Sequence, residues 1–132
     1  MLKNTSQLLA VFFFLTVVLV SCKNDSNTVN ETLFTKCWTH AFEEDSQEGI
    51  LIFRPCHTHT FPAAHYRHTF TLKENEAAEY SVLAPNDAHT TAAGKWSYDP
   101  QSKKLRITSQ EDAVVNEYEV IEINEDLLRL RE

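Results

Sequence analysis

The feature that most restricts the fold of this chain is a series of eight short β-prone runs, separated by turn signals, that begins at residue 37. In order, the runs are CWTHAFEE, GILIFRPC, RHTFTLKE, AAEYSVLA, AAGKWSYD, KKLRITSQ, AVVNEYEVIEI and DLLRLRE. No segment of this region keeps the i, i+3, i+4, i+7 apolar spacing of an amphipathic helix. Short links between neighbouring runs favour antiparallel pairing. We therefore predict an all-β domain, an antiparallel up-and-down barrel of about eight strands, with a two-sheet sandwich as the alternative.

The N-terminal segment predicts export from the cytoplasm. The apolar run Leu8 to Val20 has thirteen residues, which suits a signal peptide and is short of the roughly 20 that span a bilayer as a helix. It ends in "LVSC", which resembles the lipobox of bacterial lipoproteins and implies cleavage before Cys22 and lipidation of that cysteine. Lys23 stands where the resemblance would require Asp for inner-membrane retention, so we predict the outer membrane, with the leaflet open. An ordinary secretory signal with a chance cysteine is the alternative.

This processing divides the chain into three parts. Residues 1–21 are the predicted signal peptide, residues 22–32 a lipidated N-terminus and polar tether, and residues 33–132 the barrel domain. Loss of Lys3 would change the formal net charge from −7 to −8. An acidic chain without basic clusters argues against nucleic acid as a partner and against electrostatic attachment to anionic lipid. The predicted partner is the bilayer itself, through the acyl chains; the sequence identifies no protein partner.

Two cysteines remain once lipidation consumes Cys22. If Asp45 to Glu48 form a four-residue hairpin loop, facing residues of the first two runs have numbers that add up to 93, as 37 and 56 do. Facing Cα atoms lie about 4.5–5.5 Å apart in an antiparallel pair, within disulfide range. We therefore predict a Cys37–Cys56 disulfide, with two free thiols or metal ligands as the alternative.

The segments WTHAFEED, FRP, LAPND, GKWSYD with LRI, and YEV with LLRL together resemble a small lipocalin-like domain of bacterial lipoproteins. The similarity covers nearly all of residues 33–132. Gly94-Lys95-Trp96 has the G-x-W form common in lipocalin-like strands, whereas Lys36 stands where Gly would be expected before Trp38. The resemblance implies a barrel that holds a small apolar or amphipathic molecule. A barrel of this size can also be filled by its own side chains.

We predict that this ligand would contact residues on the inner face and at the rim of the barrel. The predicted contacts are Trp38, His40, Phe53, Arg54, Arg67, Phe70, Tyr80 and Trp96. For His40 a hydrogen-bonded core histidine is the alternative, and the two arginines could instead pair with Glu on neighbouring strands.

Five of the six histidines fall in or beside the two long links, and in a simple meander these links share one end of the barrel, opposite Glu43 to Asp45. They are His57, His59, His65, His68 and His89. Their spacing is compatible with a zinc or copper site, and a polar rim that titrates near pH ~6.5 is the alternative. No Gly-rich phosphate loop, nucleophile elbow or catalytic-cysteine context appears, so we predict no enzymatic activity and no required cofactor. The function predicted is ligand binding by an envelope lipoprotein; the alternatives are metal binding and a filled-core structural or interaction module.

Overall fold

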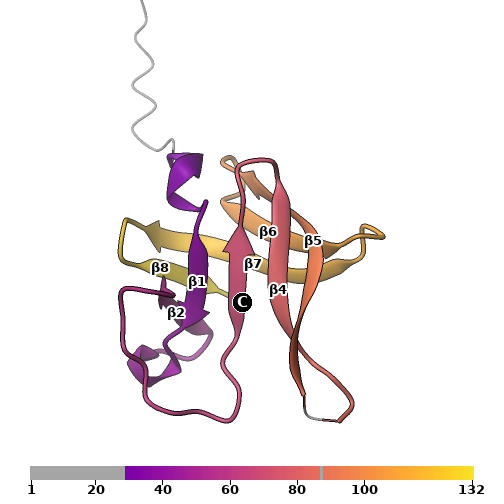
Figure 1. The fold of residues 1–132 in the computed structure, drawn as a ribbon. Coiled ribbons are helices and arrows are strands. Elements are labelled where there is room, and N and C mark those ends of the chain that lie inside the picture. Colours follow the sequence, from indigo (N-terminus) through magenta and orange to yellow (C-terminus); the bar gives the residue numbers. More distant parts are fainter. Residues whose placement is uncertain (1–28, 87) are drawn as a thin grey trace, which may run out of the picture.

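Within residues 29–86 and 88–132, which the computed structural model describes, eight antiparallel strands close into one barrel (Figure 1). The strands are β1 (Cys37–His40), β2 (Ile50–Pro55), β3 (Thr69–Leu72), β4 (Ala77–Leu83), β5 (His89–Asp99), β6 (Lys104–Ser109), β7 (Val114–Ile123) and β8 (Leu128–Arg131). Two short 3-10 turns in the same ranges, η1 (Glu31–Leu33) and η2 (Phe42–Glu44), precede and follow β1. The predicted all-β class and eight-stranded antiparallel barrel are confirmed.

The predicted signal peptide, Cys22 and the tether up to residue 28 lie outside the described residues. Across residues 29–86 and 88–132, no helix has the length and apolar character needed to cross a membrane.

The order of strands around the barrel differs from a simple meander at one place. From β3 to β8 each strand pairs with the next, but β1 lies between β2 and β3, and β2 pairs with β8. Because β2 and β3 are both antiparallel to β1, they run in the same direction, and the link between them must lead from one end of the barrel to the other. We call this link, residues 56–68, the strap. Its thirteen residues reach up to about 45 Å when extended, which is ample for the crossing.

This strand order defines two ends. The N-terminal end carries η1 and the β3–β4, β5–β6 and β7–β8 turns. The far end carries η2 and the β4–β5 and β6–β7 turns, and β3 begins there. The strap starts at Cys56 on the N-terminal end and finishes at His68 on the far end.

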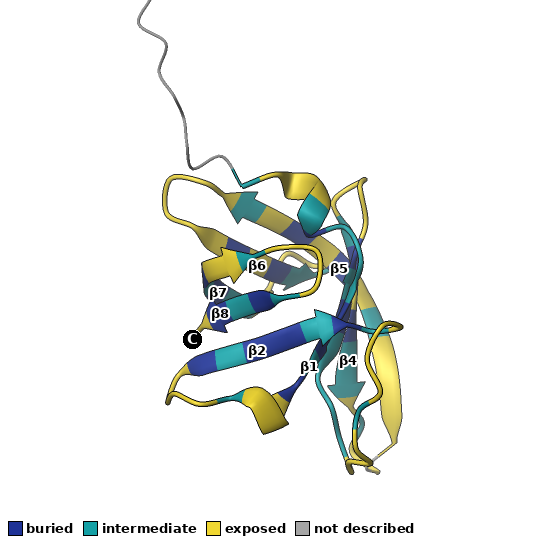
Figure 2. Cartoon of the chain, turned by 90° about the vertical axis from the view of Figure 1, so that its left-hand side faces the viewer, coloured by how far each residue is buried: buried dark blue, intermediate teal, exposed yellow. Residues whose placement is uncertain are grey.

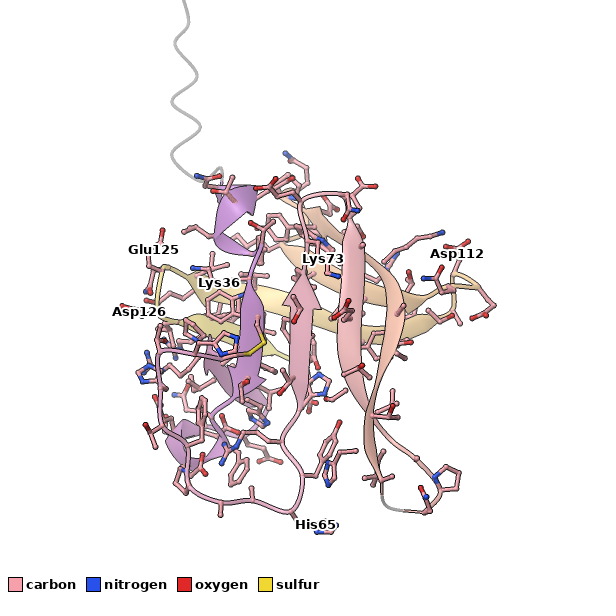
Figure 3. All side chains as sticks on the ribbon, viewed as in Figure 1. Lys36, His65, Lys73, Asp112, Glu125 and Asp126 are labelled. Carbon is pink, nitrogen blue, oxygen red and sulfur yellow. A yellow bond between two sulfur atoms is a disulfide. The ribbon has the colours of Figure 1, made fainter. Side chains whose placement is uncertain are left out.

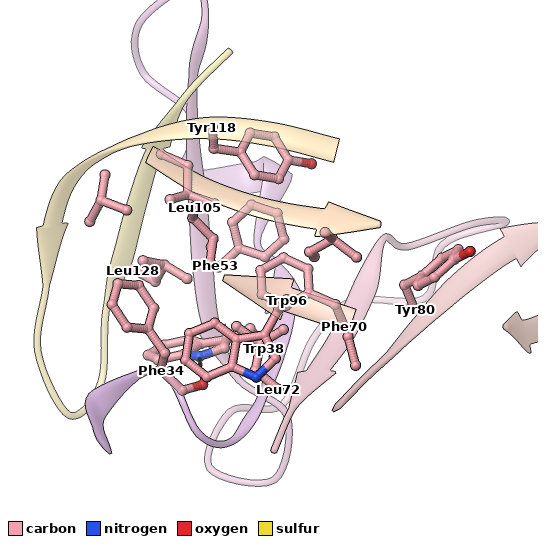
Figure 4. Close-up of a cluster of buried hydrophobic side chains, with 14 residues drawn as sticks. Phe34, Trp38, Phe53, Phe70, Leu72, Tyr80, Trp96, Leu105, Tyr118 and Leu128 are labelled. Atoms are coloured by element: carbon pink, nitrogen blue, oxygen red, sulfur yellow. Dashed lines mark hydrogen bonds between the residues drawn. The ribbon is translucent and has the colours of Figure 1, made fainter. Parts of the chain in front are cut away.

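The interior of the barrel is filled by apolar side chains from every strand, as Figure 4 shows, and Figure 2 marks the buried positions along the strands. The members of this cluster are Phe34, Trp38, Phe53, Phe70, Leu72, Ala78, Tyr80, Trp96, Leu105, Ile107, Tyr118, Val120, Leu128 and Leu130. Strand alternation supplies them: in β5, Gly94 and Trp96 face inward whereas Lys95 is exposed. At Gly94 a Cβ atom would collide with the carbonyl oxygen of Thr108, so glycine allows β5 and β6 to approach closely here.

Phe34 closes the N-terminal end of this core. It has no exposed surface, and its ring lies 4.8 Å from that of Tyr98 and 5.8 Å from that of Trp96. The indole Nε1 of Trp38 donates to the Phe34 carbonyl oxygen at 3.1 Å, and that of Trp96 donates to the Lys73 carbonyl oxygen at 2.8 Å. Both indoles are thus buried with their polar atoms bonded, as aromatic residues with a donor require.

The predicted register of β1 against β2 is confirmed, but the predicted four-residue loop Asp45 to Glu48 is not, because β1 ends at His40 and the link to β2, residues 41–49, contains η2. Trp38 faces Pro55 and His40 faces Phe53, which is the register that places Cys37 opposite Cys56. These cysteines form a disulfide with a Cα–Cα distance of 5.4 Å. The disulfide therefore fixes the first residue of the strap to β1.

Candidate functional site

The aromatic residues predicted to line a ligand come together, but they contact one another. Trp38, Phe53 and Phe70 have no exposed surface, and Tyr80 and Trp96 retain only 5% and 7%. The rings of Phe53 and Phe70 lie 5.0 Å apart. These side chains form the core of the barrel itself.

The two predicted rim arginines instead lie on the outside and bind glutamates of η2. Arg54 Nη2 lies 2.6 Å from Glu44 Oε2, and Arg67 Nη2 lies 2.6 Å from Glu43 Oε1. Hydrogen bonds from the Arg67 guanidinium lower the pKa of Glu43 to about 2, and the Arg54 guanidinium lowers the pKa of Glu44 in the same way. Both carboxylates therefore stay charged well into the acidic range.

Arg67 also joins the strap to η2. Its guanidinium carbon lies 4.3 Å from the ring centroid of Phe42 and 4.8 Å from that of Phe61. It donates to the carbonyl oxygens of His40 at 2.8 Å and Pro62 at 3.0 Å. One side chain thus connects the end of β1, η2 and the strap, and the aromatic faces add cation–π attraction.

Asp45 completes a run of three paired acids. Its Oδ2 lies 2.7 Å from His40 Nε2, and its Oδ1 accepts a hydrogen bond from the Ile52 amide at 2.8 Å. The His40 ring stacks on Phe53, with 5.1 Å between centroids. His40 is therefore a partly buried, hydrogen-bonded histidine at the edge of the core.

His68 also lies against the Phe53 ring, and it makes fewer hydrogen bonds than His40. Its Nδ1 lies 3.4 Å from Ser81 Oγ, and its ring centroid is 5.9 Å from that of Phe53. In the described part of the chain, two buried side-chain polar atoms lack a hydrogen-bond partner: His68 Nε2 and Asn116 Oδ1. Burial, and secondarily the nearby His40, lowers the pKa of His68, which favours the neutral ring.

The histidines do not share one end, so the predicted placement was wrong. His57 lies beside Cys56 and Glu125 at the N-terminal end. His65 and His89 meet at the far end, with ring centroids 5.7 Å apart, and Tyr66 stacks on His89 at 5.5 Å. Figure 3 shows His65 at the opposite end from Lys73, which follows β3.

The acids also lie at a different end from the one predicted. Glu43 to Asp45 occupy the same end as His65 and His89, because β1 sits between β2 and β3. Over residues 29–86 and 88–132, no three His, Cys, Asp or Glu side chains come close enough to hold a metal ion.

The sequence interpretation missed the paired η2 acids and the aromatic partners of Arg67. Part of this site could have been found in the sequence. The three acids follow β1 closely, and the predicted register of β1 and β2 places His40 and Arg54, which pair with two of them, on adjacent strands. The contact of the strap with η2 had no local signal, because it depends on the crossing.

Comparison with protein-family models, with curated proteins and with solved structures finds no match for this chain.

Proposed function

We propose that this chain is an outer-membrane lipoprotein whose lipocalin-like barrel is a filled interaction module, with partners bound on its outer surface. The observation that carries this proposal is the packing of Trp38, Phe53, Phe70, Tyr80 and Trp96 against one another in the core. A pocket for a small molecule commonly measures roughly 300 Å³ or more. An interior ligand of that size would have to displace several of these rings.

The closed eight-stranded barrel and the inward-facing Trp96 support the lipocalin-like assignment. The strand order departs from an uninterrupted meander, since β1 separates β2 from β3. The lipoprotein assignment rests on the "LVSC" segment after the apolar run.

The proposed anchor gives the barrel an orientation. Cys22 lies seven residues before Val29, where the described chain begins, and η1 then leads into the N-terminal end. Seven extended residues reach at most about 25 Å. A lipid on Cys22 would therefore keep the N-terminal end near the bilayer and leave the far end free for partners.

Native mass spectrometry of the mature protein, purified from its own host, tests the filled barrel. We expect the mass of the acylated chain without a noncovalent apolar ligand. A Phe53→Ala variant soaked in benzene serves as the positive control, because an apolar cavity of that kind can bind benzene. A stoichiometric lipid-like ligand on the natural chain would overturn the filled-module proposal.

A separate experiment tests the anchor. Cys22→Ser should abolish labelling by a fatty-acid probe and release the domain from membranes, whereas Cys56→Ser, as the matched control, should keep the label. Unchanged labelling of the Cys22→Ser chain would remove the lipoprotein assignment and leave the filled barrel untouched.

A further inference from the structure

The strand β5 extends beyond its partner on one side. It pairs with β4 from His89 to Lys95, but with β6 only from Gly94 onward, where Gly94 faces Ser109. Within the described residues, no strand pairs with β5 on the β6 side from His89 to Ala93. Figure 1 shows the β4–β5 hairpin projecting at the far end, away from β6 and β7. The barrel thus leaves a free strand edge there.

The backbone N–H and C=O groups of successive residues in β5 point alternately to its two sides. The Trp96 amide donates toward β4, to the Glu76 carbonyl oxygen, at 2.8 Å. Since backbone groups alternate along a strand, those of Thr90 and Ala92 also point toward β4. The groups of Thr91 and Ala93 point the other way, those of Ala93 at the level of Gln110, just after β6, and those of Thr91 into the space beyond it.

The opposite edge of the same hairpin is covered. Beyond the last residue paired with β3, Tyr66 Oη lies 3.3 Å from the Ser81 carbonyl oxygen and 3.0 Å from Ser81 Oγ. Ser81 Oγ also accepts the Thr69 amide at 2.9 Å. The Tyr66 side chain and the Thr69 backbone amide therefore cover the edge of β4 at Ser81, whereas the β5 edge stays open.

The open edge lacks the usual protection against pairing. Its sequence, HTTAA over 89–93, has no lysine, proline or acidic residue, and such residues are what natural proteins place on exposed edges. Apolar side chains border it: Leu83, opposite His89 in the ladder, is 51% exposed, and Val114 is 58% exposed. Val114 pairs with Thr108, which itself pairs with Lys95, so Val114 lies at the level where β6 leaves β5.

We propose that the edge of β5 from His89 to Ala93 binds an extended segment of another polypeptide, which pairs antiparallel with β5 and carries apolar side chains at alternate positions. Main-chain hydrogen bonds to Thr91 and Ala93 would supply affinity, as in other strand additions. The Lys95–Asp112 ion pair, with 2.8 Å between Nζ and Oδ1, links β5 to the β6–β7 turn and limits the site on one side.

The occupant is a different chain, and this part of the inference rests on the proposed anchor. If two copies paired through antiparallel β5 edges, their strands would run in opposite directions. Their N-terminal ends would then point in opposite directions too, which two anchors in one membrane do not permit. An extended segment of a partner has no such restriction.

Amide exchange measured by NMR on the mature chain, made soluble by Cys22→Ser, tests the site. The probe is a synthetic peptide in which threonine and valine alternate, with a lysine at each end. We expect the Thr91 and Ala93 amides to exchange about tenfold more slowly with peptide, because new hydrogen bonds protect them. The Thr90 and Ala92 amides, already bonded to β4, should be unchanged.

Two matched pairs of reagents control the experiment. A Thr91→Pro variant should lose the peptide effect, since it lacks the amide at the edge, whereas Thr91→Val should keep it. A peptide N-methylated on the amides that would face β5 should have no effect.

Three outcomes would overturn the proposal. One is unchanged exchange at millimolar peptide, and another is equal protection by the N-methylated peptide. The third is protection before any peptide is added that disappears on dilution, which would assign the edge to a second copy. Because the chain used is soluble, none of these outcomes bears on lipidation of Cys22.

Discussion

At the N-terminal end of the barrel the residue that covers the core is Phe34, whereas at the far end the covering contacts are made by Arg67, Glu43 and Asp45. Phe34 is fully buried, and the indole donors beside it are bonded to backbone oxygens. Phe42, the aromatic residue of η2, is 42% exposed and lies under the Arg67 guanidinium. One end is therefore closed by apolar burial, which does not depend on pH, and the other by ion pairs, which titrate and are screened by salt.

The largest expected difference between the ends concerns the two phenylalanines. Phe34→Ala should lower the free energy of unfolding by about 3–5 kcal/mol, because it removes a fully buried ring and leaves a cavity. Phe42→Ala, the matched change at the far end, should cost only about 1 kcal/mol, mostly cation–π attraction. Urea denaturation at neutral pH measures both. Equal losses would show that the two ends are closed in the same way.

The second prediction concerns the strap, which is fixed covalently at the N-terminal end and by Arg67 at the far end. The Cys37–Cys56 bond joins residues 19 positions apart. Replacing both cysteines with serine should lower the free energy of unfolding by about 3 kcal/mol, the chain-entropy value for a loop of this length.

Thiol titration provides the control for this experiment. Neither Cys37 nor Cys56 of the unreduced barrel domain should react, and both should react after reduction. Two reactive thiols in the unreduced protein would contradict the bond, and a loss well below 1 kcal/mol on its removal would show that Arg67 alone holds the strap.

The third prediction separates the two ion pairs of η2. Arg67→Gln should raise the pKa of Glu43 from about 2 toward its ordinary value, because the guanidinium hydrogen bonds are lost, and should leave Glu44 unchanged. Arg54→Gln should raise the pKa of Glu44 alone. NMR titration of the side-chain carboxyl carbons measures both shifts. A change in the pKa of both carboxylates in either variant would mean that the two ion pairs act as one network.

The sign of the pH effect follows from the lowered pKa. A carboxylate that titrates lower in the folded chain stabilises the fold above its unfolded pKa. For Glu43 this contribution is present above pH 4.5 and is lost as the pH falls toward 2. The contacts of η2 at the far end should therefore weaken in acid, whereas the packing around Phe34 should not. In Arg67→Gln the pH dependence of the η2 contacts should be smaller, because the pKa of Glu43 is no longer lowered.

The features predicted correctly from the sequence are those that depend on the alternation of side chains along a strand and on short links between strands. The β1–β2 register was derived from an expected hairpin loop over residues 45–48, and it correctly pairs Cys37 with Cys56 although the observed link is longer and contains η2. The inward aromatic residues follow from the period of two, since Trp38, Phe53 and Phe70 all lie on the inner face. That their rings would fill the barrel could not be predicted, because it depends on the space between strands.

The prediction of which loops lie at which end of the barrel was wrong because it assumed the wrong order of strands. Local patterns identify strands but not their neighbours, and the strap is long enough either to turn back beside β2 or to cross to the far side of β1. It crosses, which moves Glu43 to Asp45 to the end that holds His89 and separates His57 from both. The pairing of Arg67 with Glu43 depends on that same crossing, so it could not be derived from either segment alone.

The smallest expected effect is that of zinc on the melting temperature. His65 and His89 are 5.7 Å apart between ring centroids, and a stable zinc site needs at least three protein ligands at about 2.0–2.1 Å. Nε2 of His40 already binds Asp45, and His57 lies at the other end of the barrel. We therefore expect no zinc-dependent rise in melting temperature at neutral pH.

The measurement is decisive because occupied sites stabilise strongly. Zinc at about a hundred times its Kd would add about 2.7 kcal/mol to the free energy of unfolding, more than the expected cost of Phe42→Ala. A rise that His65→Ala and His89→Ala both abolish, while His57→Ala leaves it unchanged, would turn the far end into a metal site. Without such a rise, His65 and His89 belong to the same polar closure of the far end as Arg67 and Asp45.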